Sequence, residues 1–198
     1  MDLTWLASAG AFAVSMSATP GPNNAMLTAS GATWGFRRTV PHMLGITLGF
    51  PAMVVIVALG AGEAFRAQPW LHEALRWIGA AYLLWLAWCI AMARPDAAAD
   101  EAGGRPFSLM QAGLFQWVNP KAWAVALGAV VTFTSQAGLL VEAAVLALIF
   151  LAVTPPVAMF WTLVGVGAAR VLRTRSARRW FNRAMAALLV ASLVPTLL

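Results

Sequence analysis

Long hydrophobic runs, separated by short polar segments, account for almost the whole chain. Each run approaches or exceeds the roughly 20 residues that a helix needs to cross a ~30 Å hydrocarbon core. The runs cover residues 3–19, 40–65, 70–93, 107–133, 139–166 and 180–198. This pattern predicts an all-α membrane protein with six transmembrane helices, in which residues 1–198 form a single transmembrane domain.

Composition and charge agree with a membrane protein. Hydrophobic residues make up 61% of the chain and charged residues 10%, whereas about a quarter of a typical soluble domain is charged. The formal net charge is +6, and a basic excess also occurs in nucleic-acid-binding proteins. Here the basic residues lie at the ends of the hydrophobic runs, where membrane insertion uses them. The sequence therefore predicts no binding to nucleic acid.

The basic residues lie mainly in every second connection between the runs. The first, third and fifth connections and their flanks hold Arg37, Arg38, Arg94, Arg105, Arg170, Arg173, Arg175, Arg178, Arg179 and Arg183. The opposite side holds Arg66, Arg76, Asp2, Glu63, Glu73 and Glu142. Because cytoplasmic loops are enriched in Lys and Arg, the odd connections are expected in the cytoplasm and both termini outside, in the periplasm.

A polar linker at residues 94–106 divides the chain near its middle, with three hydrophobic runs on each side. The half-repeats cover about residues 1–93 and 107–198. Because each half has an odd number of spans, the second half must enter the membrane from the side opposite to the first. This is the topology of an inverted repeat, a plan common among transporters.

Each half contains a proline motif inside its first predicted helix. Pro20, Gly21 and Pro22 interrupt helix 1, and Pro120 interrupts helix 4. Proline lacks an amide hydrogen and clashes with the preceding turn, so each motif frees backbone carbonyls. Within a membrane such breaks persist only inside protein or along a watery cavity. Paired breaks in corresponding helices indicate a transporter's binding site, so helices 1 and 4 are expected to form one.

Polar side chains at both breaks are the candidates for contacting a solute. Asn23, Asn24, Asn119 and Lys121 are expected to bind it, and the prolines with Gly21 are expected to shape the site. Lys121 is the most informative of them, because a charged side chain near the middle of a membrane requires a partner or water. In the alternative interpretation, Lys121 extends to the membrane surface and the asparagines only cap the broken helices.

Further polar residues are expected to line the path to this site. Ser8, Ser15, Thr19 and Asn23 are spaced by 7, 4 and 4 residues, which places them on one face of a helix. Asn24 and Thr28 continue this face beyond the break. The path-lining candidates are Ser15, Thr19, Thr28 and Gln116.

Three other features are distinctive. Gly45 and Gly49 form a GxxxG motif, which predicts close packing of the second helix on a neighbour. His42 begins that helix at the cytoplasmic edge, either as a group that titrates near neutral pH or as an ordinary interfacial residue. Thr154 precedes Pro155-Pro156, which predicts a bend or a hinge in the fifth helix.

Catalytic signatures are missing from the sequence. It has no phosphate-binding GxxxxGK[ST], no clustered His/Cys metal pattern and no carboxylate pair inside a hydrophobic run. It therefore predicts no enzyme, no cofactor and no metal site. Transport would be driven by a gradient unless another subunit supplies energy, and His42 and Lys121 are the candidates for proton-linked groups.

The two broken segments carry a family resemblance. TPGPNNAMLTASGATWGFRRTVPHMLGITLGF at residues 19–50 and QWVNPKAW at residues 116–123 resemble the LysE/RhtB family of bacterial amino-acid exporters. WIGAAYLLWLAW at residues 77–88 is similar to that family's third helix. The doubled asparagine and GATWGFRR resemble most the branch that exports cysteine and O-acetylserine.

The resemblance implies a secondary transporter of the bacterial inner membrane. It would export small neutral amino acids or derivatives from the cytoplasm, coupled to the proton gradient, and could form a homo-oligomer. The residues carried over by motif are Pro20, Gly21, Pro22, Asn23, Asn24, Asn119, Pro120 and Lys121. The alternatives are a homoserine/threonine or basic amino-acid exporter, a passive channel, and a membrane interaction protein that transports nothing.

Overall fold

The computed structural model describes residues 1–61, 67–92, 105–172 and 174–194, and within these ranges all regular structure is helical. Two short segments, η1 (Val57–Ala61) and η2 (Gln116–Val118), are a π-helical and a 3₁₀ turn. The α-helices are α1 (Leu3–Ala18), α2 (Pro22–Ile56), α4 (Pro69–Met92), α5 (Leu109–Phe115), α6 (Pro120–Phe133), α7 (Leu139–Val171) and α8 (Arg175–Ala191). The predicted all-α class is confirmed.

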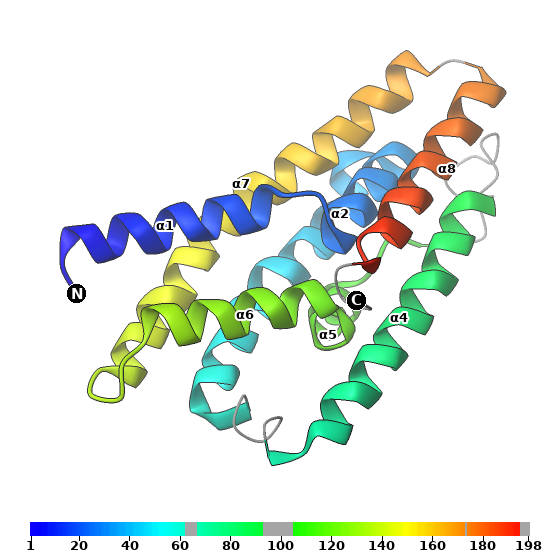
Figure 1. Cartoon of the computed structure of the whole chain (residues 1–198). Coiled ribbons are helices and arrows are strands. Elements are labelled where there is room, and N and C mark those ends of the chain that lie inside the picture. Colours follow the sequence, from blue (N-terminus) through cyan, green and yellow to red (C-terminus); the bar gives the residue numbers. More distant parts are fainter. Residues whose placement is uncertain (62–66, 93–104, 173, 195–198) are drawn as a thin grey trace.

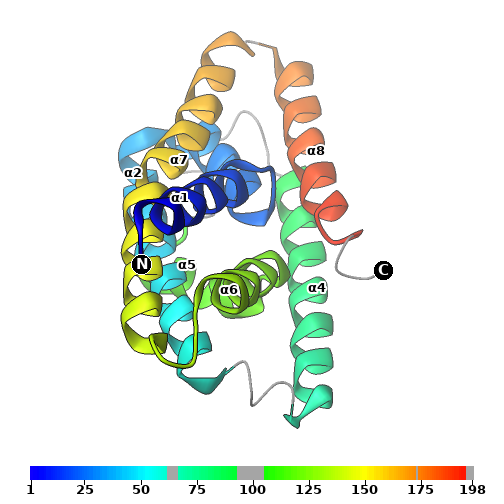
Figure 2. The ribbon, with the colours of Figure 1, turned by 60° about the vertical axis from the view of Figure 1, so that its left-hand side comes forward.

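The helices form three groups. In Figure 2, α1 and α6 lie between a pair formed by α2 and α7 and a pair formed by α4 and α8. One hydrophobic core cluster joins Ala9 and Ala13 of α1 to Ala126 of α6 and to Phe150 of α7. The small side chains of α1 allow its backbone to approach the neighbouring helices closely.

Helix α2 is two helices joined by a tight turn at Gly35. Gly35 has φ 76° and ψ 175°, a conformation that glycine adopts readily and other residues rarely do. Ser30 Oγ and Thr39 Oγ1 lie 3.0 Å apart, although nine residues of straight helix would rise about 14 Å. Residues 22–34 and 36–56 therefore pack side by side. The second hydrophobic helix begins several residues earlier than predicted, and Arg37 and Arg38 lie in helical turns rather than in a loop.

The first predicted break is present between α1 and α2. Helix α1 ends at Ala18, Thr19 and Gly21 are extended, and Pro22 occupies the first position of α2. Proline is well suited to that position because its missing N–H would have no helical partner there and its fixed φ matches the helix. Helix 1 of the prediction is therefore a pair of half-helices, α1 and residues 22–34.

The second predicted break is present between η2 and α6. Helix α5 begins with a capping box formed by Ser108 and Gln111, which satisfies two otherwise unpaired backbone donors. The chain continues through η2, becomes extended at Asn119, and restarts with Pro120 at the first position of α6. Helix 4 is thus broken as predicted.

Glycines bring several helices into close contact. A Cβ added at Gly49 would meet Cα of Gly113 at 2.7 Å, and one added at Gly45 would meet Cβ of Ala112 at 2.5 Å. The predicted packing role of the GxxxG motif is confirmed, and its partner is α5. A Cβ at Gly165 of α7 would collide with the carbonyl oxygen of Thr28 in α2.

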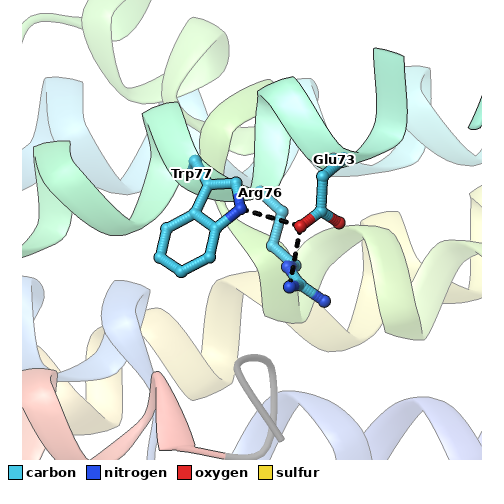
Figure 3. Close-up of polar contacts among 3 residues, drawn as sticks. All are labelled: Glu73, Arg76 and Trp77. Atoms are coloured by element: carbon cyan, nitrogen blue, oxygen red, sulfur yellow. Dashed lines mark hydrogen bonds and ion pairs between the residues drawn. The ribbon is translucent and has the colours of Figure 1, made fainter. Parts of the chain in front are cut away.

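The charged residues at the helix ends are separated as the sequence predicts. The end of α7 and the start of α8, rich in arginine, lie at one end of the molecule, and the starts of α4 and α7 lie at the other (Figure 1). Arg76 of α4 is on the arginine-poor side, where its Nη2 donates to Glu73 Oε1 at 2.9 Å. Trp77 Nε1 donates to the same oxygen at 2.7 Å (Figure 3). Glu73 thus neutralises an arginine that lies on the side with few arginines.

Some sequence predictions concern residues outside the described part of the chain. These are the loop residues Glu63, Arg66, Arg94 and Arg173, together with most of the linker at residues 94–106. Within the described residues, two helical stretches are long and apolar enough to cross a membrane, Pro22–Gly60 and Leu139–Val171. The first of them includes the turn at Gly35 and so comprises two shorter pieces.

Candidate functional site

A cavity lies where the two broken helices meet. Its volume is about 70 Å³, whereas a single water needs roughly 10–15 Å³ by the same measure. The cavity therefore has room for a group of several heavy atoms. Its lining includes Gly21, Asn23 and Asn24 from the first break and Asn119 and Lys121 from the second. The structure thus brings together the residues that the sequence predicted to contact a solute.

Lys121 connects the second break to the first. Its Nζ donates to the carbonyl oxygen of Thr19 at 2.7 Å, to Thr19 Oγ1 at 2.8 Å and to the carbonyl oxygen of Pro20 at 3.4 Å. The side chain is partly buried. Lys121 occupies the second position of α6, where a cation opposes the helix dipole, but its ammonium reaches the negative C-terminal end of α1.

The carbonyls at the end of α1 have partners from nearby side chains. The amide of Asn24 donates to the carbonyl oxygens of Ser17 and Thr19, at 2.9 and 2.8 Å. The Thr19 hydroxyl donates to the carbonyl oxygen of Met16 at 2.9 Å. Carbonyls freed at a helix end need such partners when they are away from water. Asn24 therefore caps α1 and also contributes to the wall of the cavity.

A second link between the breaks is an amide pair. Asn23 Nδ2 donates to Gln116 Oε1 at 2.9 Å, and Gln116 Nε2 donates back to Asn23 Oδ1 at 3.3 Å. Gln116 is fully buried and also donates to the carbonyl oxygen of Ala112. The two halves of the chain are thus joined at the cavity by the Lys121 contacts and by this pair.

Asn119 has a structural role in the second break. Its Oδ1 accepts a hydrogen bond from the backbone N–H of Lys121 at 3.2 Å, which caps α6. The N-terminus of α2 differs, because Gly21 provides no side-chain cap. The first backbone N–H groups of a helix lack intrahelical partners, so the backbone N–H groups of Asn23 and Asn24, two residues that line the cavity, are available to a ligand.

The predicted path-lining residues do not all face the cavity. Ser15 is exposed and is not part of the lining, so its role along the path stays a prediction. The helical spacing was extended across Thr19 to Asn23, but α1 ends at Ala18 and the face does not continue. Thr19 contributes to the site through its contacts with Lys121. Thr28 is buried, and its hydroxyl donates to the carbonyl oxygens of Asn24 and Trp161.

His42 is buried inside the protein rather than exposed at the start of a helix. It is 2% exposed, within the second part of α2, and its ring lies 5.3 Å from that of Phe107 between centroids. Neither ring nitrogen has a hydrogen-bond partner among the described residues. The helix starts about one turn earlier than the hydrophobic run, at residue 36 instead of 40, so His42 lies in its second turn rather than at its start. His42 is not part of the cavity lining.

Several lining residues were not predicted. Thr154 precedes the double proline of α7 and lines the cavity, so that motif was a usable signal. The apolar wall was not recognisable, because its residues resemble any others in a hydrophobic run. It consists of Met16, Leu27, Ile46, Phe50, Ala122, Val125, Val157 and Ala158.

The charge of the cavity is determined by Lys121. Among the residues that line it, Lys121 has the ionisable side chain and none is Asp or Glu. The described residues also contain no group of three or more His, Cys, Asp or Glu side chains placed to hold a metal ion. The site can therefore recognise charge with one ammonium, backbone amides, carbonyls and side-chain amides.

Comparison with known proteins identifies the family. The model of the LysE type translocator family matches residues 14–193. A cysteine/O-acetylserine efflux protein of Salmonella typhimurium strain LT2 is 37% identical over 118 residues, which are 58% of each chain. The protein of the same name from Escherichia coli strain K12 is 32% identical over 136 residues, 67% of each chain.

The alignment with the Salmonella protein thus spans 58% of that relative's length. No solved structure matches the chain. The family match covers most of the chain and includes both helix breaks and the cavity between them. Its members are translocators rather than enzymes, and the chain belongs to the LysE type translocator family of multi-pass membrane proteins.

Proposed function

We propose that this translocator exports small neutral amino acids or derivatives, similar to cysteine and O-acetylserine, from the cytoplasm. The observation that carries the proposal is the cavity bounded by both helix breaks and linked across them by Lys121 and by the Asn23–Gln116 pair. The substrate class is suggested by the names of relatives that are 32–37% identical.

The proposed topology has six spans in two inverted halves. The spans are α1 with residues 22–34, residues 36–56, α4, α5 with α6, α7 and α8. The breaks in the first and fourth spans support this arrangement, as does the separation of the arginine-rich ends from the ends that carry Glu73 and Glu142. Both termini would lie in the periplasm, with the chain in the bacterial inner membrane.

Recognition would use both ends of the first break. The carboxylate of the amino acid would accept hydrogen bonds from the uncapped N-terminus of α2, whose dipole favours an anion. The ammonium would bind carbonyl oxygens at the C-terminus of α1. Backbone groups at broken helices serve similar roles in other transporters. A zwitterion thus matches a wall that has no carboxylate.

Export would proceed by rocking one half against the other around the cavity, driven by the proton gradient. His42 and Lys121 remain the candidates for proton-linked groups, because each is an ionisable side chain placed within the helices. Thr154 and the two prolines after it lie where α7 borders the cavity and would provide a bend that differs between the two states.

Counterflow in proteoliposomes tests this function. Purified protein would be loaded with L-cysteine or O-acetyl-L-serine, and uptake of the labelled compound measured against protein-free liposomes, with and without a pH gradient. We expect exchange that an imposed gradient accelerates. Exchange of only threonine and homoserine, or of only lysine, would support the other substrate classes. Dissipation of a substrate gradient without accumulation of the substrate would indicate a channel. Failure of every amino acid to exchange would favour an interaction protein.

A further inference from the structure

The Lys121 contacts define a site for a primary ammonium group. A primary ammonium has three N–H donors, and Lys121 Nζ contacts three acceptors, namely two oxygens of Thr19 and the carbonyl oxygen of Pro20. We refer to these three oxygens as the ammonium cradle. The α-ammonium of an amino acid is chemically the same group. The cradle is therefore complementary to a substrate ammonium and is occupied by an ammonium of the chain itself.

We propose that Lys121 is a latch that the ammonium of the substrate displaces from the cradle, after which Lys121 pairs with the substrate's carboxylate. This inference rests on the proposed amino-acid transport. One cavity is bordered by Lys121, by Gly21, which follows the cradle residues in the chain, and by the uncapped start of α2. The exchange replaces one ammonium in the cradle by another and gives the displaced one an anionic partner.

Charge explains why such an exchange selects zwitterions. A zwitterion adds no net charge to a cavity whose described lining holds a single cation, Lys121. An amine without a carboxylate would place a second cation beside Lys121, which is costly inside a membrane. The latch thus excludes simple amines without requiring an acidic side chain, and it also disfavours amino acids with a basic side chain.

The latch also couples the two halves of the molecule. While Lys121 occupies the cradle, α6 of the second half is tied to the end of α1 in the first half. Substrate binding breaks this tie, and the carboxylate provides a new one between Lys121 and the start of α2. Since a ligand shifts a conformational equilibrium only by binding one state better than another, this change of partner provides the differential contact that alternating access needs.

The decisive experiment compares L-cysteine with cysteamine, its decarboxylated analogue, on the purified full chain under reducing conditions. Wild-type protein should bind L-cysteine at least about tenfold more tightly than cysteamine, the size of one charge-assisted contact. Lys121→Met leaves the cradle vacant and removes the carboxylate's partner, so the preference should invert. Arg179→Met removes an exposed charge on α8 and should leave the preference unchanged.

A second measurement needs no substitution at the latch. Lys121 is the only lysine of the chain, so biosynthetic incorporation of lysine labelled with ¹³C at Cε gives one lysine signal and leaves the three N–H donors in place. Saturating L-cysteine should shift this signal, and the same concentration of cysteamine should not.

Two outcomes would overturn the latch. One is a lysine signal that L-cysteine leaves in place, and the other is a folded Lys121→Met protein that keeps the wild-type preference or binds neither compound. Wild-type counterflow separates this failure from a failure of the proposed function. If amino acids exchange but the lysine signal does not move, transport stands and the latch falls.

Discussion

The two helix breaks of this protein look alike in sequence but differ in what they offer. At the first break, the carbonyl oxygens of Thr19 and Pro20 accept contacts from the second half of the chain, and the start of α2 has no side-chain cap. At the second break, Asn119 caps the start of α6. The first break therefore offers backbone groups, namely carbonyls that accept from side chains and a helix start without a side-chain cap, whereas the second supplies a cationic side chain.

This difference has a physical origin in the residue before each proline. Gly21 precedes Pro22 and has no side chain with which to cap α2, whereas Asn119 precedes Pro120 and caps α6 itself. The absence of a Cβ at Gly21 also leaves space for Lys121, because an added Cβ would lie 2.7 Å from its Cδ and 3.0 Å from its Nζ. The first break is thus shaped to receive an ammonium, and the second to deliver one.

Replacing Gly21 should have the largest effect on this asymmetry. In Gly21→Ala the new methyl group would fill the space beside the cradle that Lys121 and then the substrate ammonium need, so we expect L-cysteine exchange to fall at least tenfold, about 1.4 kcal/mol. Gly10→Ala is the matched control, because an added Cβ meets nothing within 4 Å there and alanine favours a helix. Counterflow rates, normalised to the amount of protein in the membrane, would measure both. Wild-type exchange in Gly21→Ala would show that the close contact is unimportant.

The caps of the two breaks should differ in their contribution to stability. Asn24 makes two hydrogen bonds to freed carbonyls of α1, whereas the Asn119 cap makes one, to the N–H of Lys121. Buried side-chain hydrogen bonds in membrane proteins contribute about 0.6–1.7 kcal/mol each. Asn24→Ala should therefore cost about 2 kcal/mol and Asn119→Ala about 1 kcal/mol, measured as free energies of unfolding in bicelles by steric trapping. Equal losses, or a larger loss for Asn119→Ala, would contradict the asymmetry.

The sequence predicted the positions of the two breaks but not the contacts between them. Proline's missing N–H is a local property, so Pro22 and Pro120 mark the starts of half-helices without knowledge of the fold. The partner of Lys121 is Thr19, 102 residues away, and only the packing of the two halves brings them together. The cap formed by Asn24 is closer in sequence, but its carbonyl partners depend on the extended conformation of the chain after Ala18.

The observed helix boundaries differ from those that the hydrophobic pattern indicates. Ser15 was assigned to a polar face that the break at residues 19–21 interrupts. His42 was assigned to the start of a helix because the hydrophobic run starts near it, but the turn at Gly35 lets the helix start earlier. The extended residues 19–21 and the turn at Gly35 are backbone conformations that the hydrophobic pattern does not record.

Substitution of His42 has the smallest expected effect and is the most diagnostic, because His42 is a buried polar group outside both breaks. Its ring nitrogens have no partner in the described part of the chain, whereas Thr39, three residues earlier in α2, donates to the carbonyl oxygen of Gly35 at 2.8 Å. A buried polar group without a partner costs about 1–3 kcal/mol, and some contact with Phe107 would be lost. His42→Leu should therefore raise the free energy of unfolding by about 1 kcal/mol, whereas Thr39→Val should lower it.

Transport by the same variants separates structure from function. If burial of His42 has no purpose, His42→Leu should be more stable, should exchange L-cysteine at the wild-type rate, and should be accelerated by a pH gradient as much as the parent is. If His42 is proton-linked, the variant should gain stability but lose the acceleration by the gradient while keeping gradient-free exchange. A loss of stability would instead show that the ring nitrogens have partners in the folded state. Only the second result would assign proton coupling to a residue outside the breaks, and it would leave substrate recognition to Lys121 and the cradle.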